Sequence, residues 1–82
     1  MGKHDNTYRD IMSGRSDNNI AFQDLCGLLD YMGFRCNIKG DHYIFRMDET
    51  PIVNIQPEGN KAKGYQVRQI RKLFREHDLE VW

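Results

Sequence analysis

The sequence has few cysteines and no long apolar run. Cys26 and Cys36 are the two cysteines among 82 residues, and they form no Cys-x-x-Cys pair, so no zinc site of the usual spacing is expected. One thiol falls in a helix pattern and the other in a strand pattern, which favours core packing over a disulfide. No apolar stretch approaches the ~20 residues of a transmembrane helix, so we expect no membrane contact.

Other common functional signals are missing as well. The first six residues are polar and no apolar stretch follows them, so we expect no secretory segment and a cytoplasmic location. The chain has no His-x-x-x-His pair, and Gly59 and Gly64 lack the strand-loop-helix setting of a phosphate loop. We therefore expect neither a metal ion nor another cofactor.

The net charge is zero, but the charges are unevenly distributed. Twelve basic residues balance twelve acidic ones in the whole chain. The segment 61–75 nevertheless carries six basic residues and no acidic one. Such a run is typical of a solvated helix face, and it would also bind a phosphate backbone. A nucleic-acid partner is therefore not excluded by the net charge.

Apolar periodicity predicts two helices and three strands in one domain, 1–82. The helices are expected from Phe22 to about Met32 and from Tyr65 to about His77, because apolar residues recur there at three- and four-residue intervals. The strands are expected at 34–39, 42–47 and 52–56, where apolar and polar residues alternate. Of the remaining segments, 1–18 is expected to hold at most one short helical turn at Tyr8–Ser13, 57–64 is a loop, and 79–82 is a tail.

This order predicts an α+β fold, α-β-β-β-α, in which both helices cover one face of a three-stranded antiparallel sheet. Counting in twos along the strands assigns Tyr43, Phe45, Val53, Ile55 and the apolar residues of 34–39 to the covered face, whereas Ile44 and Ile52 face outwards. The polar residues predicted on the outer face are Arg35, Asn37, Lys39, His42, Arg46, Asn54 and Gln56.

A histidine follows the most pronounced turn of the sequence. Gly40-Asp41 is a good turn sequence, and His42 opens the strand after it. A free imidazole titrates near about 6.5, and general acid-base catalysis contributes on the order of 10²–10⁴-fold. The spacing alone is equally typical of a polar residue without a task. His4 is expected in a tail and His77 at a helix end, and neither is assigned to catalysis.

The element order and its residues resemble the HicA family, small ribonuclease toxins of toxin-antitoxin modules. The resemblance runs from about Tyr8 to His77, and its most telling motif is Gly40-Asp41-His42, where the family has Gly-Ser-His. Further stretches that carry it are Asn54-Ile55-Gln56-Pro57 and Tyr65-Gln66-Val67-Arg68. Two positions depart from the family pattern, because Asp41 replaces the usual Ser and Gly64 stands where Pro is frequent.

The resemblance implies a fold like that of double-stranded-RNA-binding domains and metal-independent cleavage of mRNA. It also implies His42 as the general acid/base and inhibition by a HicB-type antitoxin. From the alternation of the strands we add Lys39 and Arg46 as ligands of the scissile phosphate. The cationic residues predicted to contact RNA are Lys39, Arg46, Lys61, Lys63, Arg68, Arg71, Lys72 and Arg75.

Two other functions fit the same residues. The first is a catalytically silent RNA-binding module that uses only the basic helix, and Asp41 beside His42 keeps this alternative open. The second is an interaction protein whose outer sheet face docks a partner chain. Its binding would ignore salt, whereas phosphate contacts weaken steeply as salt rises.

Overall fold

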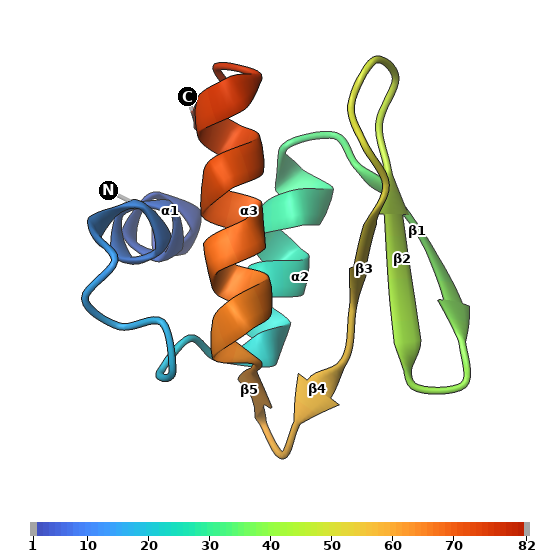
Figure 1. Cartoon of the computed structure of the whole chain (residues 1–82), viewed down its shortest axis with the longest axis horizontal. Helices are drawn as coiled ribbons and strands as arrows, with labels where there is room; N and C mark the ends of the chain where they lie inside the picture. The colour runs from blue at the N-terminus through green and yellow to red at the C-terminus, as the bar shows by residue number, and fades with distance from the viewer. Residues whose placement is uncertain (1, 82) are drawn as a thin grey trace.

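The computed structural model describes residues 2–81, which form three helices and five strands (Figure 1). The elements are α1 (Lys3–Ser13), α2 (Phe22–Tyr31), β1 (Arg35–Lys39), β2 (His42–Arg46), β3 (Val53–Ile55), β4 (Pro57–Glu58), β5 (Lys61–Ala62) and α3 (Gly64–Glu76). Strands β1, β2 and β3 form an antiparallel meander in that order, and β4 pairs with β5 separately. The α+β class and the three-stranded antiparallel sheet are thus confirmed.

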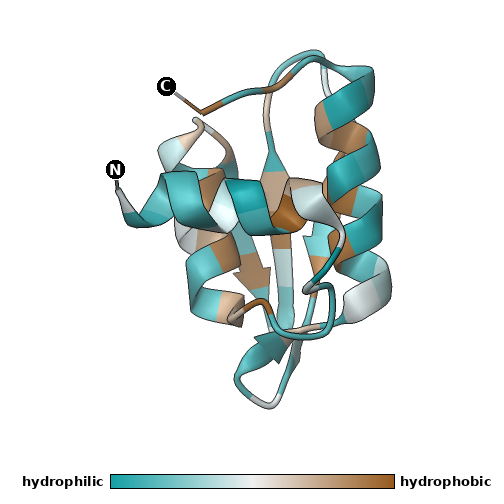
Figure 2. Cartoon of the chain, turned by 90° about the vertical axis from the view of Figure 1, so that its left-hand side faces the viewer, coloured by the Kyte–Doolittle hydropathy of each residue, from teal (hydrophilic) through white to brown (hydrophobic). Residues whose placement is uncertain are grey.

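The elements stack in three layers. The sheet is covered on one face by α2 and α3, and α1 lies on the far side of these two helices (Figure 1). Seen from the α1 side, α1 crosses in front of α2 and α3 with the strands behind them (Figure 2). No helix of residues 2–81 is long and apolar enough to cross a membrane.

The core lies between the sheet and the two covering helices. Phe45 of β2 and Ile55 of β3 are almost completely buried, as are Leu29 of α2 and Val67 and Ile70 of α3. The side chains of β2 and β3 therefore alternate as predicted, with Phe45, Val53 and Ile55 towards the helices. Burial of each such side chain contributes about 1.5–3 kcal/mol, so this packing sets the strand register.

The prediction that β1 has one buried face is wrong. All five residues of β1 are exposed, including Cys36 and Ile38, and only Phe34 just before the strand is buried. The reason is visible in Figure 1, where α2 and α3 lie over β2 and β3 while β1 forms the edge away from them. Alternation in the sequence indicates which side chains share one face of a strand, but it does not show which strands the helices cover.

The segment predicted as a loop at 57–64 contains the β4–β5 hairpin, which caps α2. Ala21 cannot accept the free amides at the start of α2, and we expected Asn19 or water to do so. Instead the Asn60 carbonyl accepts the Phe22 N–H at 3.0 Å, and the Ala62 N–H donates to Ile20 O at 2.8 Å. The hairpin thus fixes the start of α2 from a distant part of the sequence.

The N-terminal segment is also more ordered than predicted. Instead of one turn at Tyr8–Ser13, it forms the 11-residue helix α1, whose Ile11 is fully buried. His4 does not lie in a tail, because its ring stacks on Tyr31 with centroids 4.6 Å apart. Tyr8 stacks on Phe74 and donates to Leu79 O at 2.6 Å.

The C-terminal tail therefore packs against α1 up to residue 81. Leu79 and Val81 pack against the core as half-buried residues. Met1 and Trp82 lie outside the described residues, so the predicted tail 79–82 is described only as far as Val81.

A buried ion pair holds α3 to the segment after α1. Arg71 donates to both carboxylate oxygens of Asp17 at 2.8 and 3.3 Å and to the Ile11 carbonyl at 3.1 Å. The two charged side chains are only 15% and 13% exposed. Arg71 thus has three hydrogen bonds inside the protein, which is a structural role.

Asp17→Asn should lower the free energy of unfolding by about 2–3 kcal/mol, because it leaves the Arg71 guanidinium partly buried without its counter-charge. Urea denaturation followed by circular dichroism measures the change. Asp48→Asn is the matched control, since Asp48 pairs with Arg35 at 3.4 Å on the surface and should change stability by less than about 0.5 kcal/mol. Equal losses in the two variants would contradict the structural role of Arg71.

The two cysteines are free and differ in exposure. Burial raises the pKa of Cys26 to about 12, and the nearby Cys36 thiol adds to this shift. The pKa of Cys36 is also raised, first by desolvation, although its side chain is exposed. Cys26 packs against the core as expected, whereas the core role predicted for Cys36 is wrong.

Iodoacetamide should alkylate Cys36 at least about tenfold faster than Cys26 in the native protein at pH 8, because the thiolate is the reactive form. Mass spectrometry of tryptic peptides gives both rates. In concentrated urea the two rates should converge, since unfolding removes the burial that keeps Cys26 protonated. Equal native rates would show that Cys26 is not shielded by the core.

Candidate functional site

The β1–β2 turn delivers His42 to the outer face of the sheet. Gly40 has φ 61°, which suits the first central position of a type II′ turn, where glycine is favoured. Lys39 and His42 are register partners on the two sides of the turn, so their side chains share one face. The His42 side chain is 49% exposed. The predicted turn and the outward direction of His42 are therefore confirmed.

A directed chain of hydrogen bonds holds the His42 ring. Lys63 Nζ donates to Gln56 Oε1 at 3.1 Å, Gln56 Nε2 lies 3.0 Å from His42 Nε2, and Asn54 Oδ1 lies 3.3 Å from His42 Nδ1. An ammonium can only donate, so it turns the Gln56 amide nitrogen towards the ring. Gln56 Nε2 also lies 3.4 Å from His42 Nδ1, so the amide nitrogen faces both ring nitrogens, and the imidazole is held between Gln56 and Asn54.

Asp41 adds an acidic group to this site. Its Oδ1 lies 3.8 Å from His42 Nε2, and its side chain is 74% exposed. Once the ring takes up a proton at Nε2, this carboxylate is close enough to accept a charge-assisted hydrogen bond after a small movement. The same carboxylate repels a phosphate group that approaches Nε2 from the turn.

A hollow of about 260 Å³ opens beside the imidazole. Its lining residues are His42 from β2, Asn54 and Gln56 at β3, and Tyr65, Gln66 and Gln69 from the first turns of α3. Tyr65, Gln66 and Gln69 are absent from the predicted site. The residues that line the hollow with His42 lie 12 to 27 positions from it in the sequence.

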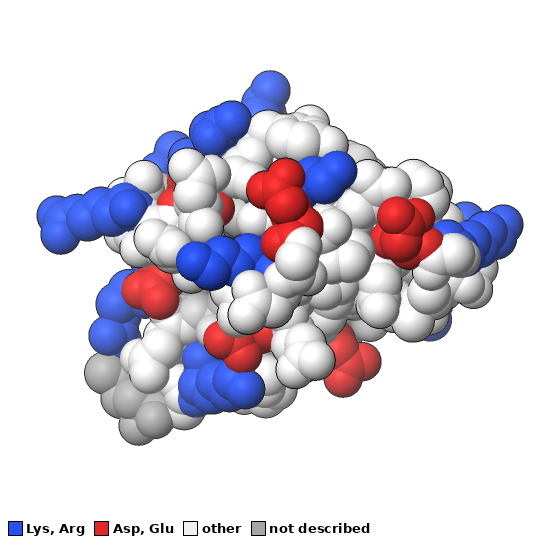
Figure 3. Space-filling view, turned by 90° about the horizontal axis from the view of Figure 1, so that it is seen from below, with Lys and Arg blue, Asp and Glu red and all other residues white. Residues whose placement is uncertain are grey.

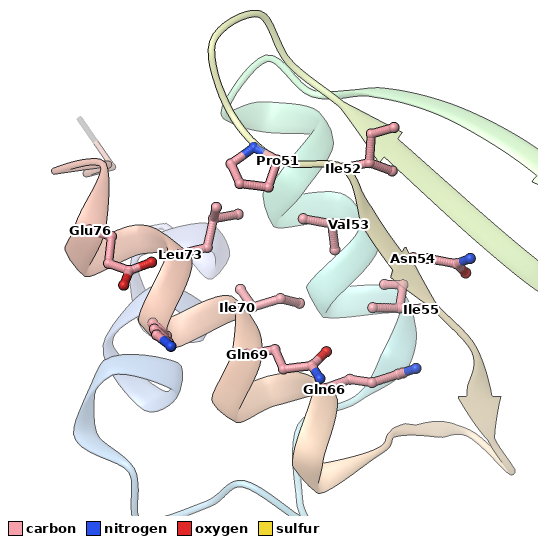
Figure 4. Close-up of a pocket in the computed structure, with 11 residues that line it drawn as sticks. Pro51, Ile52, Val53, Asn54, Ile55, Gln66, Gln69, Ile70, Leu73 and Glu76 are labelled. Carbon is pink, nitrogen blue, oxygen red and sulfur yellow. The ribbon is translucent and has the colours of Figure 1, made fainter.

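Gln66 is the buried link between the helix side and the strand side of this hollow. Its side chain is 5% exposed, its Oε1 accepts the Gln56 N–H at 3.1 Å, and its Nε2 donates to Tyr65 Oη at 3.4 Å. Figure 4 shows Gln66 reaching from α3 towards the end of β3. The signal in the sequence was a polar residue four positions before Ile70 on the buried stripe, because a buried amide needs a partner.

An apolar groove of about 240 Å³ continues from the hollow between β3 and α3. Asn54, Gln66 and Gln69 line both concavities, and Val53 and Leu73 belong to the groove. In the close-up, Val53 points towards α3 while Asn54 points away from it (Figure 4). The charged residues that line the groove are Lys72 and Glu76 of α3, whereas the imidazole of this surface lies at the His42 end.

The predicted cations divide into those near His42 and those remote from it. Lys39 is the register partner of His42, and Lys63 is joined to it through Gln56. Arg46 lies four residues along β2 from His42, about 13 Å away at strand spacing, so the two do not hold the same phosphate. Arg71 is paired inside the protein, and its hydrogen-bond donors are already used. The prediction that Arg71 contacts RNA is corrected accordingly.

The remaining predicted cations are exposed but scattered. Lys61 donates to Asn19 Oδ1 at 2.8 Å from the β4–β5 hairpin. Arg68, Lys72 and Arg75 are exposed on α3, and of these Lys72 lines the groove beside Gln69. In the view of Figure 3, lysines and arginines alternate with acidic side chains rather than forming one continuous band. Lys72 is thus accessible to a ligand, whereas Arg71 is not.

Within residues 2–81, no three side chains among His, Cys, Asp and Glu lie together as a metal site would require. Searches with this sequence and structure found no matching protein-family model, no matching curated protein and no matching solved structure. The fold and site place the chain in the class of small α+β domains with a polar sheet face.

Lys63→Met should change the environment of the His42 ring, because the Gln56 amide loses the ammonium that fixes its oxygen. Long-range ¹H–¹⁵N NMR spectra of the imidazole at about pH 8, where a free imidazole is neutral, report on both ring nitrogens. The Nδ1 and Nε2 resonances of His42 should shift in the variant relative to the unaltered protein.

Lys61→Met is the matched control for this test, since Lys61 bonds to Asn19 and not to the His42 chain. Its spectrum should equal that of the unaltered protein. Unchanged His42 resonances in the Lys63→Met variant would contradict the role of Lys63 in holding Gln56 against the ring.

Proposed function

We propose that this protein is a HicA-type endoribonuclease, the toxin of a toxin-antitoxin module, and that it cleaves mRNA in the cytoplasm. His42 is the general acid/base, no metal takes part, and a HicB-type antitoxin inhibits the enzyme. The observation that carries the proposal is the exposed His42 ring, which Asn54 and Gln56 orient on a wet sheet face opposite Lys39. The resemblance of Gly40-Asp41-His42 to the family motif supports it.

The arrangement suits a reaction in which the RNA supplies its own nucleophile. The 2′-oxygen attacks the adjacent phosphorus, the bond to the 5′-oxygen breaks, and a 2′,3′-cyclic phosphate and a 5′-hydroxyl end result. One proton must leave the 2′-hydroxyl and one must reach the departing 5′-oxygen. A positioned imidazole transfers such protons, and the Lys39 ammonium on the same face stabilises the charge that develops on the phosphate.

The Gln56 amide lies against the ring that exchanges protons with RNA in this proposal. Its Nε2 lies 3.0 Å from His42 Nε2 and 3.4 Å from Nδ1, so Gln56 must move away from the ring when the substrate binds. Lys63 holds Gln56 from the other side through its hydrogen bond to Oε1. In this proposal Asn54, Gln56 and Lys63 are positioning residues and His42 is the catalytic residue.

The fold and the surface charge support the remaining parts of the proposal. Two helices on one face of a three-stranded meander correspond to the arrangement of double-stranded-RNA-binding domains, with α1 and the β4–β5 hairpin as additions. The exposed cations Lys39, Lys61, Arg68, Lys72 and Arg75 supply positions for RNA phosphates. They would also attract an acidic surface of the antitoxin.

His42→Ala should reduce RNA cleavage by about 10²–10⁴-fold, because it removes the group that transfers protons. Cleavage of a labelled mRNA fragment in the presence of EDTA measures the effect, and growth arrest on expression provides a second readout. His77→Ala is the matched control, since His77 lies exposed at the end of α3 and should retain full activity. Cleavage that persists in His42→Ala would refute the assignment.

One observation favours a binding-only module as the second candidate. Both ring nitrogens of His42 already have amide neighbours, and Asp41 places a negative charge beside Nε2. Such a module would bind RNA without cutting it. Salt-sensitive RNA binding by the unaltered protein together with a complete lack of cleavage would select this alternative.

A further inference from the structure

The aromatic ring of Tyr65 lies exposed beside the proposed catalytic histidine. Tyr65 is 49% exposed and lines the same hollow as His42. Phe22 and Tyr43 pack edge to face, and Tyr8 and Phe74 stack on each other. Among residues 2–81 Tyr65 has no such ring partner. The exposed ring leaves apolar surface in contact with water, and a planar ligand would cover that surface.

The rest of the hollow presents amide groups with unused hydrogen-bonding capacity. Asn54 uses its Oδ1 towards His42, and its Nδ2 has no partner among residues 2–81. The Gln69 amide has none either within this range. Asparagine and glutamine amides match the paired donor and acceptor of a base edge. The hollow has a volume of about 260 Å³. This is slightly below the range of about 300–1,000 Å³ that is usual for pockets that bind drug-sized ligands.

The ring is held at a fixed place relative to the histidine. Gln66 donates to Tyr65 Oη and accepts from the backbone of Gln56, whose side chain contacts the His42 ring. Gln66 is 5% exposed, so this link is shielded from water. A planar group stacked on Tyr65 would therefore lie in the hollow that the His42 ring and Gln69 also line.

We infer that the hollow is a nucleobase subsite, in which one unpaired base of single-stranded RNA stacks on Tyr65 and is read by the Gln69 amide. Single-stranded RNA is recognised in this way because its bases are free to stack on aromatic side chains and expose their edges. The base belongs to a nucleotide that flanks the phosphate at His42. This inference rests on the proposed function for its ligand, and it assigns Tyr65 and Gln69 as the residues that select the cleavage position.

The test measures binding separately from cleavage. All proteins carry His42→Ala, and fluorescence anisotropy gives their affinity for a labelled six-nucleotide single-stranded RNA. Adding Tyr65→Leu should weaken binding by about 5- to 100-fold, since one base–aromatic stack is lost. Tyr65→Phe keeps the ring and should restore most of the affinity. Tyr31→Leu removes an exposed tyrosine that lines a different concavity and should have no effect on binding.

An abasic scan of the same RNA shows whether a base is the ligand. One abasic position should weaken binding to the Tyr65 protein and have no further effect on the Tyr65→Leu protein, because both changes remove the same stack. Gln69→Ala should reduce the difference in affinity between RNAs that carry different bases at that position. Circular dichroism and thermal unfolding check that each variant is folded.

Three results would overturn the proposed subsite. The Tyr65→Leu and Tyr65 proteins would bind the RNA with equal affinity, or the abasic site and Tyr65→Leu would weaken binding additively. The third result is that the protein binds no RNA at all. The proposed catalytic function fails by a different result, which is undiminished cleavage by His42→Ala. Tyr65-dependent binding of RNA by a protein that never cuts it would support the subsite and refute the nuclease.

Discussion

The buried amide of Gln66 joins the core of this protein to its candidate site. It lies on the stripe of α3 that includes Val67 and Ile70, and its oxygen accepts the backbone N–H of Gln56 at the end of β3. A buried amide without partners costs about 1–3 kcal/mol, so this residue fixes α3 at one place along the strand. That placement brings Tyr65 to within the same hollow as His42.

The basic residues that look alike in the sequence have different roles in the structure. Arg71 is a structural residue, because Asp17 and the Ile11 carbonyl use its donors. Lys63 orients the Gln56 amide, whose nitrogen lies against the His42 ring. Lys39 lies opposite His42 on β1, and Lys72 lines the groove between β3 and α3.

Helix α1 and the β4–β5 hairpin, which the predicted element order lacked, support the site as well as the fold. The β4–β5 hairpin caps α2 through the Asn60 carbonyl, and the same hairpin leads directly into Lys63 and Tyr65. Helix α1 covers the side of α2 and α3 away from the sheet (Figure 1). In a chain of 82 residues, such extra layers increase the buried fraction, which rises with domain size.

Alternating and helical periodicity was sufficient to determine the strands of the three-stranded sheet, two of the helices, the turn at Gly40 and the outward direction of His42, but not the β4–β5 hairpin. These features depend on neighbours in the sequence, and so local patterns encode them. Only the tertiary structure decided that β1 is uncovered, that Arg71 pairs with Asp17, and that Gln66 links Tyr65 to the strand that holds His42. These contacts join residues that are distant in sequence, and the relative placement of whole elements determines them.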